Sequence, residues 1–196
     1  MKFKLLFYGD LKTNPKHRNI YIHSLRTFIH YQLVELMKQS PWSRLVDHQG
    51  ANPKKSPSIS KTVHGIEFHS LITKGMKFLA ELDINLLHPS IAGTKHADLD
   101  NRLKSLLDAL KAPTLDNEVP ADAFKDKNKM YTLLEDDSLV SRININTSHL
   151  LTHDIFDQNP AVVFGHDNNI NNNIFMIIDV KLRIREGTVE NLPFMV

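Results

Sequence analysis

The chain has 196 residues, of which 41% are hydrophobic and 23% are charged, an ordinary balance for one sizeable soluble domain with a hydrophobic core. No run of about 18 apolar residues is present, so no membrane-spanning segment is expected, and the absence of cysteine excludes disulfides, thiolate metal sites and a thiol nucleophile. The net charge of +2 permits a local nucleic-acid-binding patch without arguing for one, and the composition fits a cytoplasmic protein.

The first half of the chain is expected to form a strand, a long helix and two more strands. Lys2 to Tyr8 alternates in hydrophobicity, as a half-buried strand does. Residues 19–39 carry apolar side chains at helical spacing, and Pro41 ends that helix. Val63 to Ile72 is predicted as one strand. Met76 to Leu87 gives the clearest strand, because apolar and polar residues alternate along it.

A second helix is predicted to follow, and it begins with carboxylates. Asp98 stands where an N-cap belongs, and Pro113 lies just beyond the predicted end of the helix. Asp100, Lys104 and Asp108 recur every fourth residue on a neighbouring face. The apolar stripe of this helix consists of Leu99, Leu103, Leu106, Leu107 and Leu110.

Two more strands, Leu139 to Asn146 and Ile174 to Ile184, complete the predicted domain. The fold class is therefore α+β: a mixed sheet with two main helices packed on one face, in the order strand-helix-strand-helix-strand-strand when the weaker candidate strand, Val63 to Ile72, is left out. Residues 1–196 are expected to form one domain with insertions near 40–75, 112–129 and 150–173.

Three aspartates are candidate metal ligands: Asp98, Asp100 and Asp137, the last of an acidic run that starts at Glu135. They would converge at one sheet edge if the strand beginning near Leu139 neighbours the strand ending near Leu87. Carboxylate oxygens without cysteine suit Mg²⁺ or Mn²⁺, ions that activate water for attack on phosphate.

A simpler interpretation also fits the same residues. In it, Asp98 caps the helix, the charge of Asp100 interacts favourably with the positive end of the helix dipole, and Asp100 and Lys104 form an ordinary surface ion pair. From the pattern alone, this structural interpretation is favoured over a metal site.

The run Asp98-Leu99-Asp100-Asn101, followed by Lys104 and later by Asp136-Asp137 before a strand, resembles the RusA family of Holliday junction resolvases. The resemblance covers about residues 76–146. It implies that Asp98, Asp100 and Asp137 are catalytic metal ligands, that Lys104 is catalytic, and that the protein is a homodimer that cuts four-way DNA junctions. The chain is longer than compact members of that family, which leaves its substrate preference and dimer geometry open.

The resemblance implies a magnesium-dependent endonuclease that acts on branched DNA in recombination and repair. Two alternatives stay open: a DNA-binding protein without catalysis on the same scaffold, and a metal-dependent hydrolase of another phosphoester. The candidate phosphate contacts, which solvated loop charge explains equally well, are Lys12, Lys16, Arg18, Lys125, Lys127 and Lys129. The absence of a phosphate-cradling glycine loop argues against an NTPase.

Overall fold

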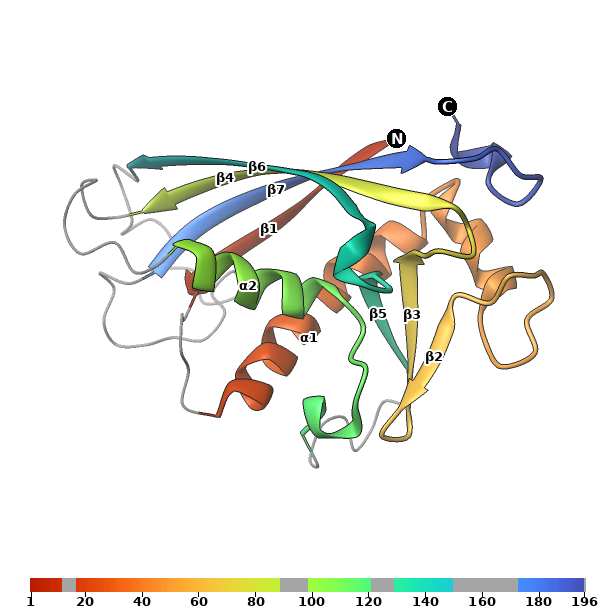
Figure 1. The fold of residues 1–196 in the computed structure, drawn as a ribbon, viewed down its shortest axis with the longest axis horizontal. Helices are drawn as coiled ribbons and strands as arrows, with labels where there is room; N and C mark the ends of the chain where they lie inside the picture. Colours follow the sequence, from red (N-terminus) through yellow and green to blue (C-terminus); the bar gives the residue numbers. More distant parts are fainter. Residues whose placement is uncertain (12–16, 89–98, 121–128, 150–172, 196) are drawn as a thin grey trace.

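Two β-sheets and two α-helices make up the described part of the chain, which comprises residues 1–11, 17–88, 99–120, 129–149 and 173–195 of a computed structural model (Figure 1). The strands are β1 (Lys2–Asp10), β2 (Ser60–Val63), β3 (Ile66–Ile72), β4 (Phe78–His88), β5 (Lys129–Leu134), β6 (Val140–His149) and β7 (Asn173–Ile184). The α-helices are α1 (Arg18–Met37) and α2 (Leu99–Leu110). Short 3₁₀ helices are η1 (Trp42–His48), η2 (Asp116–Glu118), η3 (Asp137–Leu139) and η6 (Leu192–Phe194). The predicted α+β class is confirmed.

The larger sheet has four strands in the order β1-β7-β4-β6. β7 runs antiparallel to both β1 and β4, whereas β4 and β6 are parallel, with Ala80 beside Val140 and His88 beside His149. The sheet is therefore mixed, as predicted. The parallel pairing has one consequence for the site: β6 begins beside the start of β4 and ends beside its end.

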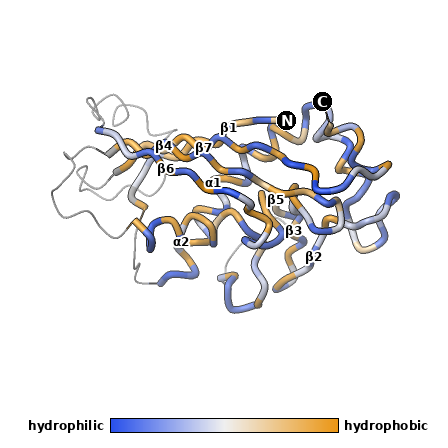
Figure 2. The backbone as a smooth tube through the Cα atoms, turned by 45° about the horizontal axis from the view of Figure 1, so that its top comes forward, coloured by the Kyte–Doolittle hydropathy of each residue, from blue (hydrophilic) through white to orange (hydrophobic). Residues whose placement is uncertain are grey.

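One face of this sheet is buried under α1 and α2 (Figure 1), and its strands show the predicted alternation of hydropathy (Figure 2). The buried apolar side chains of β4 and β7 are Phe78, Ala80, Leu82, Ile84, Leu86, Ile174, Met176, Ile178, Val180 and Leu182. The helix α1 contributes Ile22, Leu25, Ile29, Leu33 and Met37. Each large apolar side chain buried in this way stabilises the fold by roughly 1.5–3 kcal/mol before entropy is counted. Neither described helix has the combined length and apolar character that crossing a membrane requires.

A second, smaller sheet in the order β2-β3-β5 corrects the prediction of a single sheet. The segment predicted as one strand, Val63 to Ile72, contains all of β3 and the last residue of β2, and the two antiparallel strands are joined at His64 and Gly65, which have φ of 49° and 76°. Positive φ at two successive residues reverses the chain, and glycine adopts it without strain. Ile72 and Leu134 of the small sheet belong to the same core as the large one, so part of the predicted insertion near 40–75 builds the domain itself.

The two outer strands of the large sheet differ in how their free edges are covered. On β1, the side chain of Gln32 from α1 accepts a hydrogen bond from the Leu6 N–H and donates one to the Leu6 carbonyl, each at 2.9 Å. The amide of Gln32 thus takes the position that another strand would occupy. On β6 most residues are exposed.

Candidate functional site

The N-terminal end of α2 carries two of the predicted catalytic residues. Asp100 lies in the first turn and Lys104 one turn later, and both side chains are exposed. Neither has a hydrogen-bond or ion-pair partner among the described residues, so the surface pair that their spacing allowed is not formed. Asp98, the predicted cap and metal ligand, lies outside the described residues. The carboxylate of Asp100 and the ammonium of Lys104 are therefore both available to a ligand.

The third predicted carboxylate, Asp137, is paired with a lysine. Asp137 opens η3, and its Oδ2 lies 3.0 Å from Nζ of Lys111, the residue that directly follows α2. The same Nζ lies 3.1 Å from Oδ1 of Asp108. Burial alone would lower the pKa of Lys111, but hydrogen bonds and charge from Asp137 and Asp108 outweigh it and raise the pKa. Asp137 therefore already has a cation beside it.

Within one chain, Asp100 and Asp137 lie at opposite ends of α2, which corrects the prediction that they share one ion. Asp100 is in the first turn, and Asp108, the residue linked to Asp137 through Lys111, lies about 12 Å further along the helix axis. The predicted neighbours, β4 and β6, are indeed adjacent. However, the two strands are parallel, so the start of β6 lies beside the start of β4. The predicted site needed the start of β6 to lie beside the end of β4.

No larger cluster of side chains that could bind a metal ion is found in the described ranges either. Within residues 1–11, 17–88, 99–120, 129–149 and 173–195, no set of three or more His, Asp or Glu side chains is placed to hold a metal ion. Asp98 is not part of that comparison. Asp100 thus remains the one predicted ligand that is described, exposed and not engaged by a neighbouring cation.

The other members of the acidic run are held in turns. Oε2 of Glu135 accepts the backbone N–H of Lys74 at 2.8 Å, and Oδ1 of Asp136 accepts that of Ser138 at 3.0 Å. Hydrogen bonds from Ser138 hold the pKa of Asp136 below its usual value. These two carboxylates therefore stabilise the connection between β5 and β6.

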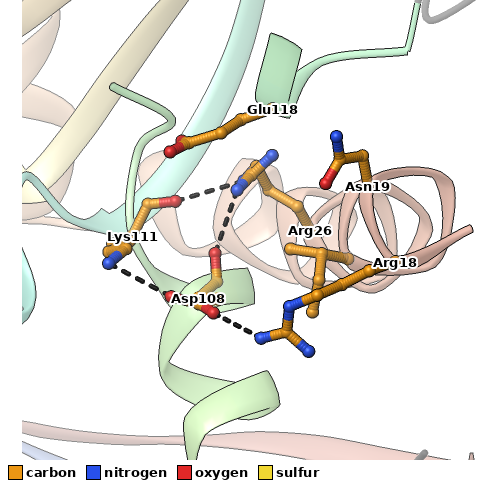
Figure 3. A pocket seen from close by; sticks show the side chains of 7 residues that line it. Arg18, Asn19, Arg26, Asp108, Lys111 and Glu118 are labelled. Carbon is orange, nitrogen blue, oxygen red and sulfur yellow. Dashed lines mark hydrogen bonds and ion pairs between the residues drawn. The ribbon is translucent and has the colours of Figure 1, made fainter. Parts of the chain in front are cut away.

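A cluster of charged side chains that the sequence did not predict as a site joins α1 to the C-terminal end of α2, with Asp108 at its centre (Figure 3). Oδ2 of Asp108 lies 2.6 Å from Nη2 of Arg18, and Oδ1 lies 3.1 Å from Nζ of Lys111. Nη1 of Arg18 also donates to Oγ of Ser105 at 3.2 Å. The spacing of Asp100, Lys104 and Asp108 predicted that the three residues share one face of the helix. It gave no indication that Asp108 contacts Arg18, which lies 90 residues earlier.

Arg26 forms the buried part of this cluster. Its side chain is 2% exposed, and its guanidinium donates to the carbonyls of Asp108 (2.9 Å) and Lys111 (3.1 Å), which lie at the C-terminal end of α2. Burial lowers its pKa to about 10, partly offset by the charges of Glu118 and Asp108. The sequence does contain an indication that Arg26 is buried, because it stands between Ile22 and Ile29 on the apolar stripe of α1.

The predicted phosphate-contacting residues fall into three groups. Arg18 is half-buried and bound to Asp108, as just described, so the structure gives it a partner within the chain. Lys129 is the exposed first residue of β5. The remaining four, which are Lys12, Lys16, Lys125 and Lys127, lie outside the described residues.

The outer face of the large sheet, predicted to be exposed to solvent or to face a partner, carries ion pairs between neighbouring strands. Glu81 lies 2.6 Å from Nε of Arg183 and 3.5 Å from Nζ of Lys181. Asp83 pairs with Arg142 at 3.1 Å, and Lys4 pairs with Asp179. Because these carboxylates are matched with cations along neighbouring strands, their first role is cross-strand pairing.

Comparisons with protein-family models, with curated proteins and with solved structures find no match to this chain. The residues and their geometry are therefore the basis on which a function can be proposed.

Proposed function

We propose that this protein is a magnesium-dependent, structure-selective endonuclease that cleaves phosphodiesters of branched DNA in the cytoplasm, as a Holliday junction resolvase of the RusA type in recombination and repair. One observation carries the proposal. The run Asp98-Leu99-Asp100-Asn101 stands at the beginning of α2, and Asp100 and Lys104 of that helix are exposed and unpaired among the described residues. An acid and a base one turn apart, neither used by the fold, suit a phosphate-processing site.

The chemistry of these side chains fits the proposed cofactor. Carboxylate oxygens are the ligands that Mg²⁺ and Mn²⁺ prefer, and we propose that Asp98 and Asp100 hold the ion. A bound ion of this kind supplies an activated water and stabilises charge on the phosphate. Lys104 donates to a non-bridging phosphate oxygen and so stabilises the charge that develops during attack.

The proposed enzyme is a homodimer, because paired cuts in a two-fold symmetric junction need two sites related by the same symmetry. In this proposal Asp137 joins Asp98 and Asp100 only from a second copy of the chain. Within one copy, the length of α2 separates Asp100 from the Asp137–Lys111 pair.

A second candidate function is a DNA-binding protein that does not cut. The ion pair between Asp137 and Lys111 favours it, because an aspartate already paired with a lysine has a sufficient structural role. Hydrolysis of another phosphoester by the same acidic end of α2 is the remaining alternative.

The deciding experiment compares the parent protein with Asp100→Asn on a labelled four-way junction, a duplex and a single strand, with Mg²⁺ and with EDTA. We expect the parent to cut the junction only with Mg²⁺. Asp100→Asn should lose at least 100-fold in cleavage rate, because an amide carries no charge and is a poorer magnesium ligand. Junction binding without Mg²⁺ should persist or tighten, since one charge that repels phosphate is gone.

The matched control is Asp47→Asn, the same change on η1, where the aspartate pairs with Lys55 at 3.3 Å. It should cut like the parent. A parent that binds the junction but never cuts it, with any divalent ion, would establish the binding protein instead. Cleavage of a small phosphoester in preference to DNA would support the other hydrolase.

A further inference from the structure

A cavity of about 170 Å³ opens between the first turn of α1 and the C-terminal end of α2 (Figure 3). Its lining consists of Arg18, Asn19, Ile22, Arg26, Asp108, Lys111 and Glu118. A water molecule occupies about 30 Å³ in the liquid, so the cavity has room for a group of several heavy atoms. It lies at the opposite end of α2 from Asp100, and Lys111, which pairs with Asp137, is its link to the proposed metal ligands.

The strongest indication of a ligand is the unused part of Arg26. Two of its nitrogens, Nε and Nη2, donate to backbone carbonyls, but Nη1 is buried and has no hydrogen-bond partner among the described residues. Figure 3 shows this guanidinium between Asn19 and Glu118, at the wall of the cavity. A buried charged donor without an acceptor is costly, so the cavity favours a ligand that supplies acceptor oxygens.

The charges around the cavity favour an anion. Three cations, Arg18, Arg26 and Lys111, face two carboxylates, and Asp108 is already shared by Arg18 and Lys111. Arg18 and Asn19 are also the first two residues of the 20-residue helix α1, whose positive dipole end therefore lies at the cavity. Glu118 opposes this preference, although both of its carboxylate oxygens accept hydrogen bonds from Thr114.

We propose that this cavity binds a phosphate group, with Nη1 of Arg26 as the buried donor and with Arg18 and Lys111 as the surrounding positive charge. A tetrahedral oxyanion offers acceptors in several directions, which suits donors from two helices, and guanidinium groups match phosphate oxygens well. The group is either free phosphate or a phosphate of a nucleic acid. The proposal does not depend on the nuclease activity, because no residue of the acidic end of α2 takes part.

The test measures thermal unfolding of the full chain in sodium phosphate against sodium chloride at equal ionic strength. Equal ionic strength removes the effect of screening. Specific binding raises Tm with the logarithm of the phosphate concentration above Kd, whereas the general stabilisation by an anion excluded from the protein surface grows in proportion to concentration. Isothermal titration with inorganic phosphate then gives Kd. A parent protein and a Glu118→Gln variant that are both indifferent to phosphate would overturn the proposal.

Four variants locate the site. Arg26→Lys keeps the charge but loses the planar fork, and phosphate binding should weaken at least tenfold. Arg18→Gln should weaken binding severalfold, and Glu118→Gln should tighten it severalfold because the opposing charge is removed. Arg185→Gln removes the same charge as Arg18→Gln from an exposed position just after β7 and should bind like the parent.

Since Arg26 is buried, Arg26→Lys could prevent folding, but Arg18→Gln and Glu118→Gln still decide the question. Equal Kd values for the parent and these two variants would place phosphate elsewhere and overturn the proposal. Competition experiments with inorganic phosphate identify the source of the phosphate group. A short oligonucleotide with a 5′ phosphate that displaces inorganic phosphate, while the same oligonucleotide without it does not, assigns a nucleic acid terminus. Displacement by neither assigns free phosphate, and displacement by both assigns the DNA backbone.

Discussion

His23 is a residue of α1 whose protonation is coupled to folding. It is 5% exposed, and burial, together with the charge of Arg26, lowers its pKa from 6.5 to about 4. The unfolded chain protonates this imidazole below about pH 6.5, whereas the folded protein keeps it neutral until about pH 4. The unfolded state therefore binds more protons in this window, so the free energy of unfolding decreases as the pH falls through it.

The expected result is a loss of up to about 3 kcal/mol from this group between pH 7 and pH 4, and His23→Gln should remove that part of the pH dependence. Urea unfolding at a series of pH values measures it. An identical slope for His23→Gln and the parent would show that His23 titrates normally in the fold.

Gln32 connects two elements, because its side chain satisfies the free edge of β1 at Leu6. Gln32→Glu keeps the size and the acceptor for the Leu6 N–H, but it replaces the donor to the Leu6 carbonyl with a second acceptor. Leaving that carbonyl opposite a carboxylate should cost about 1–2 kcal/mol of unfolding free energy. Denaturant unfolding measures the loss, and hydrogen exchange should show faster opening at the Leu6 amide.

The control for this change is Gln39→Glu, the same substitution at an exposed residue just beyond the end of α1. It adds the same charge without touching a strand, so stability should change by less than about 0.5 kcal/mol. If the two variants are equally stable, the hydrogen bonds of Gln32 to β1 contribute nothing measurable.

At the scale of the whole molecule, the proposed dimer makes a prediction about which copy supplies Asp137. We expect Asp100→Asn and Asp137→Asn each to be inactive as homodimers. Mixed dimers of the two should recover nicking of one junction strand, because a site shared between copies leaves one complete set of carboxylates. Co-expression with two different tags isolates the mixed dimer for a strand-scission assay.

The control is a mixed dimer of Asp98→Asn and Asp100→Asn, which should stay inactive because both residues come from the same end of α2. If the Asp137→Asn homodimer cuts like the parent, Asp137 serves the fold through Lys111 and is no metal ligand.

Patterns that repeat along one element could be predicted from the sequence, and the structure confirms them. The alternation in β4 and β7 and the stripe of α1 identify their buried faces, because side-chain direction follows from the local backbone alone. The boundary between β2 and β3 was missed although Gly65 signals a turn there, because apolar residues continue on both sides of it.

The relation between distant segments could not be predicted in the same way. Nothing in the order of residues shows whether β6 runs parallel or antiparallel to β4, and that direction decides at which end of α2 Asp137 lies. The pairing of Arg18 with Asp108 and the buried contacts of Arg26 also depend on how α1 packs on α2. The exposure of Asp100 and Lys104, by contrast, follows from their place on the polar face of α2.

The antiparallel pairing of β1 with β7 has a consequence for biosynthesis. Lys2 is matched with Lys181 and Asp10 with Asn173, so β1 leaves the ribosome long before its partner strand exists. Contacts of such long sequence separation form late and slowly. Until β7 arrives, β1 presents an unpaired strand, and its Leu6 position has a local substitute in Gln32. Chains truncated before residue 173 lack the central strand between β1 and β4, and they should aggregate or depend on chaperones.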